Sequence, residues 1–290
     1  GDRGCLPVPV VTLPPPSLLG DALALSRRFP PLRLLRSTLL PKEGERSQKR
    51  AGSGDVFWQY RPYLSGESAG RIDWRASARR EHPLIREKEQ ATLPRIRLWL
   101  DASPSMRYAS RAGLRTKLEI GTLLLTALAD LAHRGNAEAR AGLLPGSSPE
   151  KILARLATGG AWAEKLPLTK DKLQVIASDF LFDPDRLEKP LAAVRMRGGT
   201  GILLHLADPA EVAFPFQGSS RFEGLEGEAS LLADDAYALR ADYLAQWNAH
   251  AAKLEDIATR FDFTLIRCQT DAPLPESMKT LCAAVERSGS

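Results

Sequence analysis

Apolar residues change their spacing near position 95, and this change divides the chain into two parts. After position 95, short apolar runs typical of buried strands alternate with longer segments in which apolar residues recur at helical spacing. This alternation predicts an α/β fold, with a doubly wound, mostly parallel sheet and helices on both of its faces. The expected strands are 96–100, 138–144, 173–177, 201–206 and 263–267, and the expected helices are 118–133, 149–156, 184–196 and 236–260.

Residues 1–50 lack such a pattern. Eight prolines fall within positions 1–41, and a polar, basic and glycine-containing stretch follows at 44–54. Clusters of this kind predict loops and linkers rather than packed elements. We therefore expect a proline-rich arm and a basic linker, with room for only one helix, at 18–28.

Residues 51–94 alternate apolar or aromatic side chains with polar ones in two places, 55–63 and 84–90. A period of two predicts half-buried strands, and these two could pair with each other. A segment of about 45 residues buries too little area to fold by itself. We therefore expect residues 51–94 to form a β-rich extension packed on a main domain that comprises residues 95–290.

Carboxylate and hydroxyl side chains follow two of the expected strands. Asp101, Ser103 and Ser105 stand two residues apart directly after the first strand of the main domain, and Asp179 follows the third. Ligands of doubly wound sheets collect beyond the carboxyl ends of the strands, where the strand order reverses. Together these side chains would form a hard, oxygen-only site suited to Mg²⁺, or to Mn²⁺ or Ca²⁺. The alternative is that each residue caps the helix that follows it.

Composition narrows the classes of protein. With 290 residues, 43% of them hydrophobic, the chain is long and apolar enough to bury a full core. Its three cysteines are scattered and odd in number, which argues against a disulfide framework or a zinc site and favours a reducing, cytoplasmic setting. No apolar run reaches the ~18 residues that a membrane span needs. The chain also lacks the Walker-type glycine loop, the GxSxG elbow and the HExxH motif of common enzyme classes.

The charge of the chain is uneven. Residues 1–95 carry 17 Lys and Arg against 10 Asp and Glu, so they account for +7, and the whole-chain charge of +5 leaves −2 for the remainder. Residues 46–95 contain three arginines close to a tryptophan, together with an aspartate and a serine. The residues of this cluster are Arg71, Asp73, Trp74, Arg75, Ser77 and Arg79. Such a cluster could stack on and pair with nucleic acid. We favour the alternative that Arg and Asp side chains pair with each other while the tryptophan packs on the sheet, because Asp73 partly cancels the charge and no nucleic-acid-binding signature is present.

Two features together resemble a bacterial family called domain of unknown function 58. One is the segment that runs from Phe57 through the Arg71–Arg79 cluster to Arg86-Glu87, and the other is the Asp-x-Ser-x-Ser-Met sequence that begins at Asp101. The resemblance covers roughly residues 51–275 and departs from the family at Glu67, where an aspartate is usual. It implies a von Willebrand factor A-like domain with a metal-ion-dependent adhesion site. Its ligands would be Asp101, Ser103, Ser105 and Asp179, with Thr158 as a weak candidate for the threonine that completes such sites.

The resemblance also implies a mode of action. Members of this family are often encoded beside a MoxR-type AAA+ ATPase, so we expect a non-enzymatic adaptor that acts with such an ATPase in chaperone-like assembly. One alternative is a phosphoryl-transfer or hydrolytic enzyme with Asp101 as nucleophile, although Ser103 stands where haloacid dehalogenase-like phosphatases have a second aspartate. The other alternative is a nucleic-acid binder that uses residues 46–95. Contact with a membrane is not expected.

Overall fold

The computed structural model of this chain divides into two compact units, residues 1–34 together with 95–290, and residues 35–94. The residues whose structure is described are 16–34, 57–63, 68–78, 80, 82–88, 93–141, 148–157, 171, 173–225 and 229–289.

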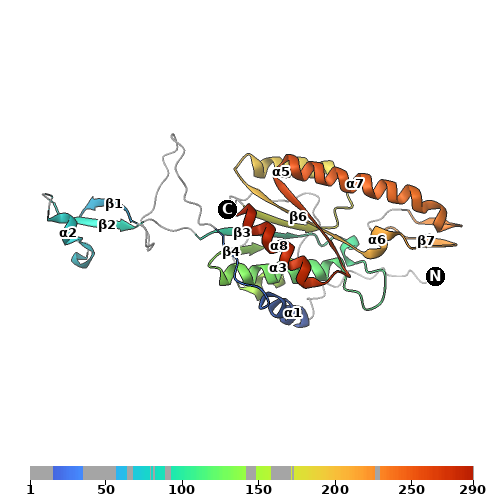
Figure 1. The fold of residues 1–290 in the computed structure, drawn as a ribbon, viewed down its shortest axis with the longest axis horizontal. Coiled ribbons are helices and arrows are strands. Elements are labelled where there is room, and N and C mark those ends of the chain that lie inside the picture. Colours follow the sequence, from blue (N-terminus) through green and yellow to red (C-terminus); the bar gives the residue numbers. More distant parts are fainter. Residues whose placement is uncertain are drawn as a thin grey trace, which may run out of the picture. The chain divides into compact units, whose positions relative to one another are not determined.

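Five parallel strands form the central sheet of the first unit (Figure 1). In spatial order the strands are β4 (Glu138–Ala141), β3 (Arg95–Leu100), β5 (Leu173–Ser178), β6 (Thr200–Ala207) and β9 (Phe263–Gln269). The chain runs from β3 outward to β4 and then returns to the other side of β3, so the strand order reverses between β3 and β5. This arrangement confirms the predicted doubly wound α/β fold, in which ligands bind at the point of reversal.

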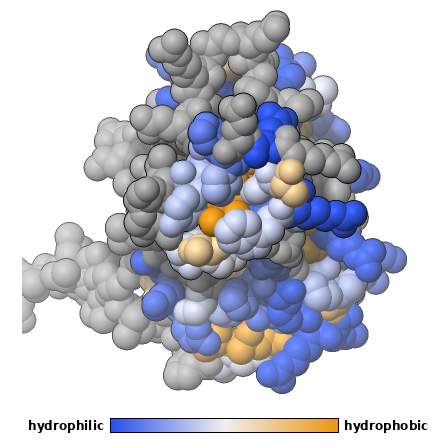
Figure 2. All heavy atoms as spheres, turned by 90° about the vertical axis from the view of Figure 1, so that its left-hand side faces the viewer, coloured by the Kyte–Doolittle hydropathy of each residue, from blue (hydrophilic) through white to orange (hydrophobic). Residues whose placement is uncertain are grey.

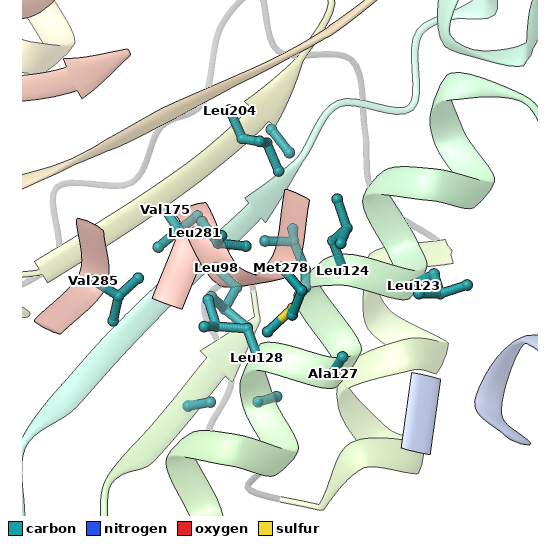
Figure 3. Packing of buried hydrophobic residues seen from close by; sticks show 14 of the residues in the cluster. Leu98, Leu123, Leu124, Ala127, Leu128, Val175, Leu204, Met278, Leu281 and Val285 are labelled. Atoms are coloured by element: carbon teal, nitrogen blue, oxygen red, sulfur yellow. The ribbon is translucent and has the colours of Figure 1, made fainter. Parts of the chain in front are cut away.

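Helices cover both faces of the sheet. One face carries α1 (Pro16–Ser26), α3 (Lys117–Arg134), α4 (Pro149–Ala157) and α8 (Leu274–Ser288), and the other carries α5 (Glu188–Arg195) and α7 (Arg240–Arg260). On the first face, Leu124 and Leu128 of α3 and Met278 of α8 gather over Leu98 of β3 (Figure 3). A second cluster lies under α5 and α7, so the strands between the two clusters are buried on both sides.

Helix α3 follows the rules for helix boundaries closely. Thr116 accepts a hydrogen bond from the backbone N–H of Glu119, and the Glu119 side chain accepts one from the N–H of Thr116, which forms a capping box. Gly135 ends the helix. The start of α3 is therefore held firmly at Thr116, next to the carboxyl end of β3.

The prediction of an N-terminal arm is wrong for residues 16–34. Leu18, Ala22 and Leu25 of α1, and Leu32 after it, are buried in the same core cluster as α3. The N–H of Leu32 also donates to the carbonyl of Leu131, 3.2 Å away. The prolines in this segment leave room for only one helix, and that helix is present as α1. Its packing on the apolar surface of α3 could not be predicted from the sequence of the segment alone.

Several short elements were not expected from the sequence, namely η2 (Pro104–Arg107), α6 (Pro209–Ala213), β7 (Ser220–Phe222) and β8 (Leu231–Ala233). The helices predicted at 184–196 and 236–260 each begin with a 3-10 turn, η4 (Pro184–Leu187) before α5 and η5 (Ala236–Leu239) before α7. Strands β7 and β8 pair antiparallel as a small separate sheet. Helix α8 was also left unassigned, although Met278, Leu281 and Val285 follow a helical spacing and are buried. No helix among the described residues is long and apolar enough to cross a membrane.

The second unit is a small hairpin with a helical turn. Strands β1 (Phe57–Pro62) and β2 (Leu84–Lys88) pair antiparallel as predicted, and η1 (Ala69–Arg71) and α2 (Trp74–Ser77) lie between them in the sequence. Whether this unit packs on the first unit stays a prediction.

The face drawn in Figure 2 is largely hydrophilic where it is coloured, and its apolar atoms are confined to small areas.

Candidate functional site

The side chains predicted to form a site lie at the carboxyl edge of the central sheet, where the strand order reverses. Strands β3 and β5 are neighbours in parallel register, with Leu100 beside Ala177. The backbone N–H of Asp101 continues this pairing by donating to the carbonyl of Ala177, 2.9 Å away. Asp101 and the Ser178-Asp179 pair therefore leave the sheet side by side, as the sequence pattern predicted.

Asp101 is buried and both of its carboxylate oxygens accept hydrogen bonds. Oδ1 accepts from the backbone N–H of Ser103 at 2.9 Å, and Oδ2 accepts from the hydroxyl of Ser178 at 2.8 Å. The hydroxyls of Ser103 and Ser105 lie 3.1 Å apart and bond to each other. Asp101 therefore stabilises the turn that leads into η2, but it does not cap that segment, because the N-cap residue is Ser103 and the Ser103 side chain makes no cap bond.

Asp179 does not cap the helical segment that follows it, because Asp183 accepts the capping hydrogen bond at the start of η4. Instead, Asp179 Oδ2 lies 2.8 Å from the ammonium nitrogen of Lys117. Lys117 is the first residue of α3 and its side chain is completely buried. The same ammonium group also contacts Glu211, and the ring of Tyr108 lies 6.0 Å from it. A lysine therefore already provides a positive charge at this edge of the sheet.

Helix α6 holds Glu211 in place. Asp208 and Glu211 form a capping box in which the Glu211 side chain accepts from the N–H of Asp208 at 2.8 Å. Asp208 Oδ2 accepts from the backbone N–H of Ser110, and the hydroxyl of Tyr243 on α7 donates to the backbone carbonyl of Glu211. Burial raises the pKa of the Glu211 carboxyl, and contact with Lys117 opposes that rise. The loop after η2, the start of α3, α6 and α7 thus meet at this cluster.

Strain is also present at the end of β5. Phe180, directly after Asp179, has a φ angle of 50°, a backbone conformation that residues other than glycine adopt only at an energetic cost. Its ring is fully buried, and its N–H donates to the hydroxyl of Ser178 at 3.0 Å. Backbone strain of this kind is concentrated at functional sites, because the surrounding packing must hold it in place.

His205 lies one strand further along the same edge. It is paired in register with Ser178 and is 3% exposed. Neither of its ring nitrogens has a hydrogen-bond partner among the described residues, and the rings of Phe180 and Trp247 flank it. Burial lowers the pKa of His205 to about 4, so the ring is neutral near pH 7.

The donor set agrees in part with a divalent cation. Two buried carboxylates and two neighbouring hydroxyls are hard oxygen ligands of the kind that Mg²⁺ takes. Within the described ranges, no group of three or more His, Cys, Asp or Glu side chains converges on one point, so a metal here would depend on the serine hydroxyls. Lys117 is the feature that opposes a metal, because its ammonium group competes for Asp179.

The remaining predicted residues lie elsewhere. Thr158 and Arg79 fall outside the described residues, and the Arg71 side chain is not described. Asp73 accepts from the N–H of Ala76 and so caps α2, and the Ser77 hydroxyl links that turn to the N–H of Leu84 at 2.8 Å. Both residues hold the second unit together.

Trp74 and Arg75 are exposed within the second unit. The indole of Trp74 is 65% exposed there, so its expected packing against the main sheet stays a prediction.

Three residues of the site were missed from the sequence, Lys117, Asp208 and Glu211. The Asp-Pro-x-Glu sequence at 208–211 carries a capping-box signature that could have located α6. Nothing in the sequence marks Lys117, because a lysine in the first turn of a helix is ordinarily solvated.

Comparison with known protein families gives one match. The family model described as "Protein of unknown function DUF58" matches residues 59–160, a range that includes Asp101, Ser103, Ser105 and Lys117. A search of curated proteins found no match. The matched range agrees with the arginine–tryptophan segment and the Asp-x-Ser-x-Ser sequence from which the resemblance was drawn, and the match supports the DUF58 family for this chain.

Proposed function

We propose that this chain is a non-enzymatic adaptor that binds an acidic side chain of a partner protein through a divalent cation. Asp101, Ser103, Ser105 and Asp179 would hold the cation, which is Mg²⁺, Mn²⁺ or Ca²⁺. When bound, the cation supplies a positive charge with an open coordination position that a partner carboxylate can fill. The observation that carries the proposal is that two buried carboxylates and two adjacent hydroxyls follow the neighbouring strands β3 and β5 at the strand-order reversal of a doubly wound sheet.

The hydrogen bonds of Asp101 fix the direction of its carboxylate. Its two oxygens accept hydrogen bonds within the fold, from Ser103 and Ser178. Each oxygen has a second lone pair, so Asp101 can hold a cation while it keeps both hydrogen bonds. This arrangement orients the carboxylate and leaves the serine hydroxyls, which bond only weakly to each other, available to turn toward a cation.

A MoxR-type AAA+ ATPase is the partner that we propose, following the family resemblance. The test is capture of the purified ATPase by the immobilised full chain. A chelator alone does not discriminate, because P-loop ATPases themselves use Mg²⁺. The informative variant is the double substitution Ser103→Ala/Ser105→Ala. It removes two oxygen ligands and leaves no hydroxyl without its partner, since the two hydroxyls bond to each other.

Ser110→Ala serves as the matched control, because Ser110 is an exposed serine of the same loop and uses only its backbone N–H in the cluster. We expect the double variant to lose capture at every Mg²⁺ concentration while its circular dichroism spectrum and the capture by Ser110→Ala stay unchanged. Equal capture by the wild-type chain and the double variant would show that the hydroxyls hold no cation used in binding.

A further inference from the structure

Lys117 places its ammonium group against Asp179, one of the proposed cation ligands. We propose that Lys117 determines the affinity and selectivity of this site, by competing with a divalent cation for Asp179. This inference rests on the proposed function and concerns how the same site chooses its cation. Its basis is the contact of the buried ammonium group with Asp179 Oδ2 at 2.8 Å and with Glu211.

The ammonium group is shielded from solvent. The Lys117 side chain is 0% exposed, and the side chains of Tyr108, Asp179 and Glu211 surround its end. Its backbone is equally fixed, because the capping box of Thr116 and Glu119 holds the first turn of α3. The charge therefore stays beside Asp179 whichever ion binds, in contrast to a surface lysine that could swing away.

Glu211 gives Lys117 a second partner. If a cation binds to Asp179, the ammonium group can keep its contact with Glu211, so neither charge is left buried alone. Glu211 cannot retreat, because its other oxygen accepts from the N–H of Asp208 and its carbonyl accepts from Tyr243. Exchange of Asp179 between the lysine and the metal is thus possible within the existing fold.

We therefore expect the site to bind cations weakly and to prefer cations of high charge density. Two like charges a few ångströms apart in a buried environment repel strongly. A monovalent ion offers Asp179 no more charge than Lys117 already does, so only a divalent ion can displace it. In the free chain this competition keeps affinity low, and a carboxylate from a partner would add the negative charge that the lysine cancels.

The test is Mn²⁺ binding to the full chain, measured by isothermal titration calorimetry and by the electron paramagnetic resonance signal of free Mn²⁺. The main variant is Lys117→Met/Glu211→Gln, which removes the ammonium group without leaving Glu211 charged and unpartnered. A second variant, Lys117→Gln, keeps a group that can donate to the carboxylates but carries no charge. Lys253→Met is the matched control, because Lys253 forms only exposed ion pairs, with Asp183 and Asp185.

We expect both Lys117 variants to bind Mn²⁺ at least about tenfold more tightly than the wild-type chain. The Lys253 variant has the same change in net charge as Lys117→Gln, whereas the main variant leaves the net charge unchanged, and the Lys253 variant should match the wild type. Equal Mn²⁺ affinity in the wild-type chain and the Lys117 variants would overturn the role of Lys117 and leave the proposed cation site standing. Absence of Mn²⁺ binding in all folded variants would overturn the proposed function itself, and this inference with it.

Discussion

A neutral imidazole buried without hydrogen-bond partners should make the stability of this fold depend on pH in a defined window. Burial holds the pKa of His205 at about 4, whereas the same side chain in the unfolded chain titrates at its ordinary value of 6.5. Between pH 6.5 and pH 4, His205 binds a proton in the unfolded chain but stays neutral in the folded chain. Stability is therefore fully present above pH 6.5 and is lost as the pH falls toward 4.

The size of this loss follows from the difference between the two pKa values. Each unit corresponds to about 1.4 kcal/mol, so His205 should cost the fold about 3 kcal/mol between pH 6.5 and pH 4. The ring is 3% exposed, so solvent screening reduces this figure little. A loss of this size is a large part of the 5–15 kcal/mol that stabilises a typical domain, according to the general range for folded proteins.

The substitution His205→Phe isolates this contribution. Phenylalanine keeps a ring of similar size between Phe180 and Trp247, whose ring centroids lie 6.1 and 5.7 Å from that of His205, but it cannot bind a proton. At neutral pH the variant should be as stable as the wild-type chain or more so, because two unpartnered nitrogens disappear from the core.

The assay is urea unfolding followed by circular dichroism at about 222 nm, a wavelength that reports the helices of the first unit, at several pH values between about 4 and 7. The free-energy curve of the wild type should fall below that of His205→Phe by about 3 kcal/mol on acidification. His133→Gln, which removes an exposed histidine from the same unit, is the control and should follow the wild type. Parallel curves for the wild type and His205→Phe would refute the reasoning.

Two further predictions concern the site and the N-terminal helix. Asp101→Ala should lower the free energy of unfolding by about 1–3 kcal/mol, since the N–H of Ser103 and the hydroxyl of Ser178 lose their acceptor, and unchanged urea midpoints would contradict this. Gly135→Ala should cost about 1–3 kcal/mol and expose residues 27–34 to limited proteolysis, because the new Cβ would lie 2.0 Å from the carbonyl oxygen of Leu32. Cleavage as slow as in the wild-type chain would show that this segment does not depend on its contact with α3.

Most of the fold followed from local pattern. Short apolar runs placed the five strands of the central sheet, because strands buried on both faces are apolar along most of their length. Helical spacing of apolar residues placed the long helices α3 and α7. The alternation of these elements predicted a doubly wound sheet. The observed strand order confirms this prediction. Asp101 and Asp179 could be assigned to one edge because parallel strands share a carboxyl end.

Local pattern failed where a residue's environment depends on distant parts of the chain. A helix is expected at 18–28 and α1 is present there, but its burial is not predicted, because the prolines around it are visible in the sequence whereas the surface of α3 that buries Leu18 and Leu25 is not. The short helix α6 was missed because its apolar pattern is too brief to repeat.

Lys117 illustrates the difference most clearly. In the sequence it is one lysine among many at the start of a helix, where water would normally solvate it. In the fold, Asp179 from the end of β5 and Glu211 from α6 meet at its ammonium group, from positions 62 and 94 residues away along the chain. The periodicity of apolar residues specifies which face of a helix or strand is buried. The charges that meet at a site come from several elements that the chain topology brings together, so no local sequence pattern predicts them.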